Sequence, residues 1–196
     1  MPGLLVIISS PSGGGKDAVI NALLNIFPNS SRFVTTTSRP PRPGNQEGVD
    51  YHFISPEKFV TKIEQGDFIE YNFYAGNYYG TERQRLNEAL TRYSLVLTQV
   101  EVNGKHNFDK TGISHLSIFL LPESLDVLRK RIEERGGVPA TNLKERLAIA
   151  EKEIAQSGDY DFRIVNAEGK LGETIEKIAE IIKPYLNVEK MLDKKA

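Results

Sequence analysis

Leu4-Leu5-Val6-Ile7-Ile8, followed directly by Ser9-Ser10-Pro11-Ser12-Gly13-Gly14-Gly15-Lys16-Asp17, is the stretch that decides the fold of this chain. The apolar run predicts a strand that is buried on both faces, as in a parallel sheet. Apolar residues then recur at helical spacing over residues 17–27, and Pro28 ends that helix. The order of strand, glycine-rich turn, lysine and helix is typical of a phosphate-binding loop, in which backbone N–H groups and the lysine bind phosphate oxygens.

This loop departs from the usual Gly-x4-Gly-Lys-Ser/Thr pattern at both ends. Ser10 stands in the place of the first glycine and Asp17 in the place of the final hydroxyl residue, whereas Gly15 and Lys16 match. The competing interpretation is a plain glycine-rich turn before a helix, and the order of the elements argues against it. The loop indicates that a nucleotide phosphate binds here, without indicating which reaction follows.

Strands and helices alternate along most of the remaining chain. Apolar runs predict buried strands over residues 95–102, 116–121 and 162–165. Helices are predicted over about 81–93 and 124–135, from Asn142 onward, and near the end of the chain, where apolar residues are spaced by four, three and four. Those apolar residues are Leu171, Ile175, Ile178 and Ile182. The alternation predicts an α/β fold, with a parallel sheet flanked by helices and right-handed crossovers.

Residues 35–80 break this alternation. Prolines and glycines over 38–50 predict an irregular loop, and residues 68–74 and 77–79 predict a hairpin. Between them, Ser55 precedes Pro56 in the manner of a helix cap. We therefore expect a small mixed β insert, in which a second ligand could bind.

Composition excludes several classes of protein. The chain has 196 residues, 39% of them hydrophobic, which predicts one compact domain. Lys and Arg number 25 and Asp and Glu 26, so the formal net charge is −1 and we expect no nucleic-acid partner. The absence of Cys excludes disulfides and thiolate chemistry. No apolar run approaches the roughly 18 residues of a membrane span, so we expect a cytosolic protein without a membrane partner.

Two arginines and two tyrosines suggest a second phosphate site. Arg39 and Arg42 lie three apart on the proline-stiffened loop, where their forked donors could hold one phosphate. The hydroxyl groups of Tyr51 and Tyr79 could add hydrogen bonds. The alternatives are a solvated basic loop for the arginines and core packing for the tyrosines.

Several motifs in a fixed order resemble the guanylate kinase family. They are Thr35-Thr36-Thr37-Ser38-Arg39-Pro40-Pro41-Arg42-Pro43-Gly44, Gly48-Val49-Asp50-Tyr51-His52-Phe53, Phe68-Ile69-Glu70-Tyr71, Gly76-Asn77-Tyr78-Tyr79-Gly80-Thr81, Arg131 with Arg135-Gly136, Arg146-Leu147 and Val165-Asn166. The resemblance covers nearly the whole chain. It implies a P-loop NTPase-like core over 1–34, 83–125 and 147–196, a GMP-binding insert over 35–82 and a helical lid over 126–146.

The resemblance also implies a role for each group of residues. Glu70 would accept hydrogen bonds from two adjacent donors of guanine, which adenine lacks, and Thr35 would contact the base. The implied GMP-binding residues are Thr35, Arg39, Arg42, Tyr51, Glu70, Tyr79, Gly80, Thr81 and Glu101. The implied ATP-binding residues are Ser12, Gly13, Gly14, Gly15, Lys16, Asp17, Ala18 and Arg135. The implied catalytic residues are Lys16, Arg39, Arg131, Arg135 and Arg146.

The alternatives for these residues are structural. Glu70 could be an exposed strand carboxylate. The lid arginines could form a solvated face balanced by Glu133, Glu134 and Glu145, which their spacing alone favours.

The chain departs from the family pattern where charge and metal are handled. Asp17 and Ala18 replace residues among which a hydroxyl is common, Asn45 replaces a Glu, and Gln99 and Glu101 each replace an Asp. Mg²⁺ is expected to accompany ATP and favours carboxylate oxygens, so Asp17 is a candidate ligand. The competing interpretation is that Asp17 only stabilises the N-terminus of its helix.

Three functions fit these observations. The first is phosphoryl transfer from ATP to GMP. The second is a related kinase acting on a phosphorylated sugar such as ribose bisphosphate, which would not need Glu70 and Thr35. The third is an inactive phosphopeptide-binding module, which Lys16 and its glycines argue against and Asp17 and Gln99 mildly favour.

Overall fold

A five-stranded parallel sheet forms the centre of the protein. The structure is a computed structural model that describes residues 2–74, 76–134 and 140–192. The strands are β1 (Leu4–Ser9), β2 (Ser30–Arg32), β7 (Leu95–Gln99), β8 (Leu116–Pro122) and β9 (Phe162–Asn166), in the order β2-β7-β1-β8-β9. Val6 pairs with Leu97 on one side and Leu116 on the other, so β1 is central. The sheet confirms the predicted α/β fold with parallel strands.

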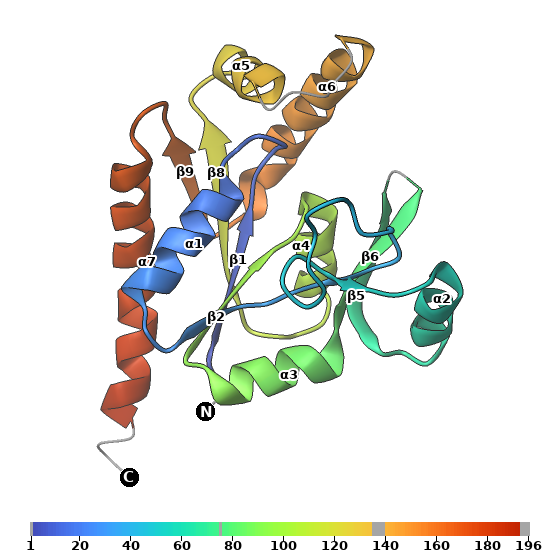
Figure 1. The fold of residues 1–196 in the computed structure, drawn as a ribbon. Coiled ribbons are helices and arrows are strands. Elements are labelled where there is room, and N and C mark those ends of the chain that lie inside the picture. Colours follow the sequence, from blue (N-terminus) through green and yellow to red (C-terminus); the bar gives the residue numbers. More distant parts are fainter. Residues whose placement is uncertain (1, 75, 135–139, 193–196) are drawn as a thin grey trace.

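Helices cover both faces of this sheet because successive side chains of β1 alternate between two cores. Val6 and Ile8 pack with α1 (Lys16–Ile26) and α7 (Leu171–Leu192), which lie side by side in Figure 1. Leu5 and Ile7 pack on the other face with α3 (Arg83–Arg92) and α4 (Val102–Asp109). Two more helices, α5 (Leu125–Glu134) and α6 (Ala140–Gln156), pack together, and a short 3-10 helix η1 (Ser157–Asp159) follows α6.

A smaller mixed sheet lies beside the main one (Figure 1). Its strands are β3 (Thr36–Thr37), β4 (His52–Phe53), β5 (Phe68–Tyr74) and β6 (Asn77–Glu82), in the order β4-β3-β6-β5. Only β3 and β4 pair in parallel. Helix α2 (Pro56–Glu64) begins after Ser55, whose hydroxyl accepts a hydrogen bond from the Lys58 N–H, as the sequence predicts. The expected hairpin is present, although its tip residue Ala75 lies outside the described residues.

Three local predictions need correction. The strand expected over 95–102 ends at Gln99, and Val102 begins α4, a helix that apolar content alone did not distinguish from strand. Thr81 does not cap α3, because its hydroxyl donates to Glu70 and Glu82 takes the cap position. Helix α6 begins at Ala140, ahead of Asn142. The last residue of the helix predicted over 124–135 lies outside the described residues.

Within residues 2–74, 76–134 and 140–192, none of the helices combines the length and the apolar character that crossing a bilayer requires.

Candidate functional site

The turn between β1 and α1 has the conformation that a phosphate-binding loop needs. Gly13 and Gly15 have φ angles of 88° and 91°, which favour glycine over residues with a Cβ. A Cβ on Gly15 would also lie 2.7 Å from the amide nitrogen of Asn166, which itself donates to the Gly14 carbonyl at 3.0 Å. The Lys16 ammonium folds back onto the loop and donates to the Ser10 carbonyl at 2.7 Å. The loop is thus held from β9 as well as from its own strand.

A cleft of about 550 Å³ opens beside this loop. Its lining comes from the phosphate loop, the small sheet, the residues between β7 and α4, and helix α6. Most of the predicted site residues lie in it: Ser12, Gly13, Lys16, Asp17, Thr35, Arg42, Tyr51, Glu70, Tyr79, Gly80, Glu101 and Arg146. Residues more than a hundred positions apart therefore share one site.

The Glu70 carboxylate is the most deeply buried acid of the cleft. The residue is 6% exposed, and its Oε1 accepts a hydrogen bond from the Thr81 hydroxyl at 2.7 Å. Burial raises the pKa of Glu70 to about 7, although the Thr81 hydrogen bond opposes the rise. A Cβ on Gly104 would come within 3.3 Å of Oε2, so that glycine keeps the second oxygen uncrowded. The alternative of an exposed strand carboxylate is wrong.

The arginine–tyrosine group divides into two parts. Arg42, Tyr51 and Tyr79 line the cleft, and the two tyrosine rings meet edge to face with centroids 5.8 Å apart. Arg39 is outside the lining, because its guanidinium lies 5.4 Å from the centroid of Tyr51 and donates to the Asn45 side chain at 3.0 Å. The sequence predicts that Arg39 and Arg42 hold one phosphate together, but in the structure only Arg42 lines the cleft.

The predicted lid arginines also separate. Arg146 on α6 is exposed and lines the cleft. Arg131 on α5 donates to the Asn166 carbonyl and to the Glu168 carboxylate, both at 3.2 Å, and lies near Gly13 outside the lining. Arg135 lies outside the described residues. Only Arg146 is thus shown at the cleft.

The two sharpest departures from the family pattern have different surroundings. The carboxylate of Asp17 accepts a hydrogen bond from the Arg32 guanidinium at 2.6 Å, while its side chain stays 61% exposed. The side-chain oxygen of Gln99 is buried in the cleft wall and has no hydrogen-bond partner among the described residues. Ala18 is exposed and Gly14 buried, and neither they nor Thr81 are in the lining.

Sequence reasoning missed a carboxylate on α6. Glu153 lies in the cleft wall, where burial raises its pKa to about 7 while Lys16 opposes the rise. Arg146, Ile149 and Glu153 are spaced by three and four along one helical face, and this spacing was the signal that could have found it. The other lining residues not predicted as site residues are Ser10, Asn72, Tyr74, Gln99, Val100 and Gly104.

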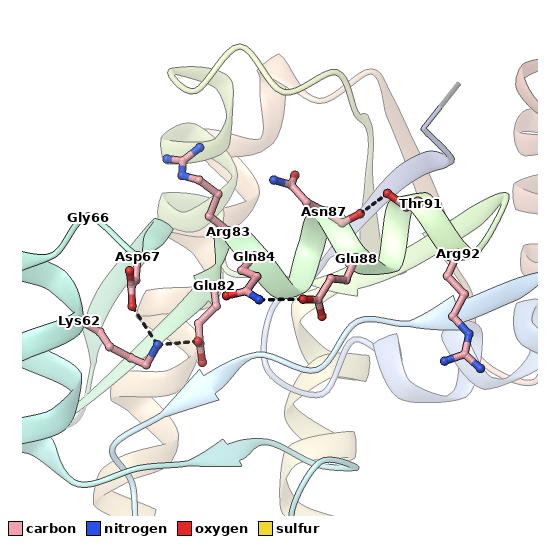
Figure 2. A pocket seen from close by; sticks show the side chains of 10 residues that line it. All are labelled: Lys62, Gly66, Asp67, Glu82, Arg83, Gln84, Asn87, Glu88, Thr91 and Arg92. Atoms are coloured by element: carbon pink, nitrogen blue, oxygen red, sulfur yellow. Dashed lines mark hydrogen bonds and ion pairs between the residues drawn. The ribbon is translucent and has the colours of Figure 1, made fainter.

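A second hollow, of about 650 Å³, lies between α2 and α3 (Figure 2). It contains none of the predicted site residues. The Lys62 ammonium bridges Asp67 and Glu82 at 3.0 and 2.8 Å, and in Figure 2 Arg83 and Arg92 point away from each other. Lys62, Asp67 and Glu82 thus pair with one another, and the two arginines do not point toward a common centre.

Among the described residues, no three His, Asp or Glu side chains gather into a group that could hold a metal ion. A divalent ion at this cleft would therefore need ligands from a bound nucleotide as well as from the protein.

Comparison with known proteins identifies relatives along nearly the whole chain. A sequence model of the guanylate kinase family matches residues 3–185. A guanylate kinase of Prochlorococcus marinus (strain MIT 9312) is 39% identical, covering 91% of this chain and 96% of that protein. A guanylate kinase of Alkalilimnicola ehrlichii is 37% identical, covering 85% and 82%. The crystal structure of guanylate kinase from Anaplasma phagocytophilum superposes with a TM-score of 0.75 at 30% identity, covering 94% of this chain and 87% of that one.

Proposed function

The chain belongs to the guanylate kinase family, and on that premise we propose that its cleft binds ATP and GMP end to end and carries out phosphoryl transfer between them. The reaction transfers the γ-phosphate of ATP to GMP and gives ADP and GDP. The γ-phosphorus leaves the oxygen that bridges it to the β-phosphate and bonds to a phosphate oxygen of GMP.

The buried Glu70 carboxylate is the observation that carries the choice of acceptor. Guanine presents the N1–H and the exocyclic amine side by side, and a carboxylate offers two acceptors to match them. Thr81 fixes one oxygen of Glu70, and Gly104 leaves space at the other. A phosphorylated sugar has no such edge, so burying this carboxylate would bring it no compensating bond.

The phosphate groups are assigned to opposite ends of the cleft. The backbone of the phosphate loop and Lys16 hold the ATP phosphates, as the glycine conformations allow. Arg42, Tyr51 and Tyr79 hold the GMP phosphate. Arg39 contacts the ring face of Tyr51, and its part in holding the same phosphate stays a prediction of the family resemblance. Thr35, Gly80 and Glu101 complete the GMP end.

Arg146 is assigned to the charge that develops on the transferred phosphoryl group. Phosphoryl transfer needs positioning and positive charge more than covalent chemistry. Arg146 on α6 is an exposed cation in the lining of the cleft that also contains the phosphate loop and Glu70. The roles of Arg131 and Arg135 stay predictions of the family resemblance. The cytoplasmic location stays a prediction from the absence of a long apolar run in the sequence.

Mg²⁺ is proposed to enter with ATP. The oxygen-rich wall fits such an ion: the buried Gln99 oxygen and the Glu101 carboxylate both lie beside the phosphate loop. Asp17 is the third candidate, although Arg32 already neutralises its charge. When bound, the metal neutralises negative charge on the phosphates.

The test compares GMP, AMP, UMP and ribose bisphosphate as acceptors at equal concentration, with ADP formation as the readout. We expect turnover with GMP to exceed that with AMP by up to about 10⁴-fold, because a site built on polar pairs rejects a base that leaves them unpaired. Glu70→Gln should narrow this ratio, since one acceptor becomes a donor facing a donor. Equal turnover of AMP, or a preference for the sugar, would contradict the assignment.

A further inference from the structure

Lys105 is a buried cation that the roles assigned above do not use. The residue is 4% exposed. Its ammonium lies 2.9 Å from the Asp159 carbonyl, 3.2 Å from the Asp159 carboxylate and 3.0 Å from the Asp109 carboxylate. An ammonium has three N–H donors, so these oxygens can satisfy all of them. The Tyr160 ring lies below the same nitrogen, with its centroid 5.0 Å away. A buried charge held this completely resists displacement.

The contact joins the two walls of the cleft. Lys105 belongs to α4, whose first turn carries Gly104 next to the Glu70 carboxylate and follows Glu101. Asp159 ends η1, which follows α6 directly, and α6 contributes Arg146 to the lining of the same cleft. In Figure 1, α6 extends from beside α5 toward the centre of the molecule. The hydrogen bond from Lys105 to the Asp159 carbonyl links α4 to η1 at this end of α6.

We propose that Lys105 is a positioning residue for phosphoryl transfer, because it fixes the base of α6 against the helix that walls the GMP end of the cleft. This inference rests on the proposed role of Arg146. Arg146 lies ten residues from the end of α6, which corresponds to about 15 Å of helix. A tilt of about 5° at the base would move it by about 1.3 Å, and a misplacement of about 1 Å can lower a rate about 100-fold.

The two carboxylates that hold Lys105 provide a matched pair for the test. Asp159 also contacts His106 at 3.0 Å, and Asp109 also contacts His115 at 3.2 Å. Their side chains are similarly exposed, at 47% and 38%. Asp109 lies on α4 itself, whereas Asp159 lies in η1 at the end of α6, so of the two carboxylates only that of Asp159 connects Lys105 to α6. Loss of either carboxylate weakens the charge network. Only loss of the Asp159 carboxylate also removes ion pairs between η1 and α4, those with Lys105 and His106, and leaves the Asp159 carbonyl as the remaining hydrogen-bond acceptor of Lys105 there.

The experiment measures kcat, the KM for GMP and the melting temperature of Asp159→Asn and Asp109→Asn in the full chain. We expect similar melting temperatures for the two variants and a kcat that falls about fivefold or more in Asp159→Asn alone, with the KM for GMP within about twofold of the parent. Lys105→Met, which removes every donor while keeping the apolar stem, should lower kcat about tenfold or more.

Equal kcat values in the two Asn variants would overturn the inference and leave Lys105 a structural residue. If Lys105→Met does not fold, the comparison of kcat between Asp159→Asn and Asp109→Asn still tests the proposal. Arg146→Ala, measured in parallel, separates the two proposals. Full activity in Arg146→Ala overturns the role of that arginine and the inference with it. Lost activity there, with parental kcat in Asp159→Asn, overturns only the role of Lys105.

Discussion

The buried carboxyl group of Glu70 ties guanine binding to pH. Only the ionised form offers two acceptors to the base, and burial raises the pKa of this group to about 7. Lowering the pH from 8 to 6 protonates most of the population. We therefore expect GMP to bind about tenfold more weakly at pH 6 than at pH 8, as measured by calorimetry.

Two other groups titrate in this range and need controls. The phosphate of GMP takes up a proton at about pH 6. Burial raises the pKa of the Glu153 carboxyl group to about 7. The pH dependence should be shallower in Glu70→Gln and unchanged in Glu153→Gln. A dependence that is equally steep in Glu70→Gln would show that another group is responsible.

The same shift has a consequence for stability without ligand. The pKa of Glu70 is higher in the folded chain than the ordinary 4.5, so ionisation disfavours the fold. The protonated Glu70 carboxyl group therefore contributes to the stability of the fold. This stabilisation is fully present below about pH 4.5 and is lost as the pH rises through about 7. Glu70→Gln should therefore raise the melting temperature at pH 8 relative to the parent protein.

Asp17 and Arg32 make a second prediction at the scale of single residues. Their ion pair places a compensated negative charge at the start of α1, beside the phosphate loop. Arg32→Met should leave Asp17 uncompensated near the ATP phosphates and raise the KM for ATP several-fold, by about 1 kcal/mol of repulsion. Asp17→Ser in the same chain should restore it. Steady-state kinetics at saturating GMP measure both, and a double variant no better than Arg32→Met would show that Arg32 itself contacts ATP.

At the scale of elements, a charge network fixes β6 and α2 beside α3 (Figure 2). Glu82 is buried at the junction of β6 with α3, where Lys62 and the Thr36 hydroxyl both donate to its carboxylate. Burial would raise the pKa of Glu82, but these hydrogen bonds and the charge of Lys62 lower it overall. Thr81, the neighbour of Glu82, holds Glu70 on the cleft side. By fixing Glu82, this network also holds the neighbouring Thr81, whose hydroxyl positions Glu70 in the cleft.

Lys62→Met should destabilise the protein by about 2 kcal/mol, because it removes the cation closest to the buried Glu82 carboxylate and leaves only the longer 3.4 Å contact with Arg85. Lys58→Met, on an exposed position of the same helix, should change stability by less than about 0.5 kcal/mol. Urea unfolding of both variants measures the difference. Equal stabilities would mean that water or Arg85 replaces Lys62 around Glu82.

The elements with clear periodicity were predictable from sequence, and the exceptions have physical reasons. The apolar run of β1 and the Ser55-Pro56 start of α2 have local causes, so the sequence alone places them. Helix α4 could not be found this way, because Val102 continues an apolar run and only its packing against Phe119 and Tyr160 reveals the change of element. Thr81 has the sequence of a cap, yet a buried carboxylate from β5 takes its hydroxyl.

The site was predictable to the extent that a motif carries it. Lys16, Glu70 and Arg42 follow from motifs and meet in one cleft. Glu153 belongs to none of the motifs. Its place in the cleft depends on the position of α6, which packs against α5 and continues into η1. The Arg39–Tyr51 contact depends on side-chain conformations within an irregular loop, which residue spacing does not determine.

At the scale of the whole molecule, the two ends of the cleft come from two different sheets. The phosphate loop follows β1 of the main sheet, whereas Glu70 and Tyr79 belong to the small sheet. Burial raises the pKa of both Glu101 and Glu153, and the charge of Lys16 at the ATP end opposes the rise in both. The two ends are therefore separate in structure but linked by charge.

Lys16→Ala should consequently abolish turnover while weakening GMP binding by no more than about threefold at low salt. The small loss is expected because Glu101 and Glu153 then repel the GMP phosphate without opposition, and raising the ionic strength should remove it by screening. Calorimetry with GMP alone at two salt concentrations measures the effect. Glu70→Gln is the matched control with the reverse pattern: GMP affinity should fall while the affinity for a non-hydrolysable ATP analogue is kept. A large, salt-independent loss of GMP affinity in Lys16→Ala would mean that Lys16 contacts GMP directly and that the cleft is one site, not two.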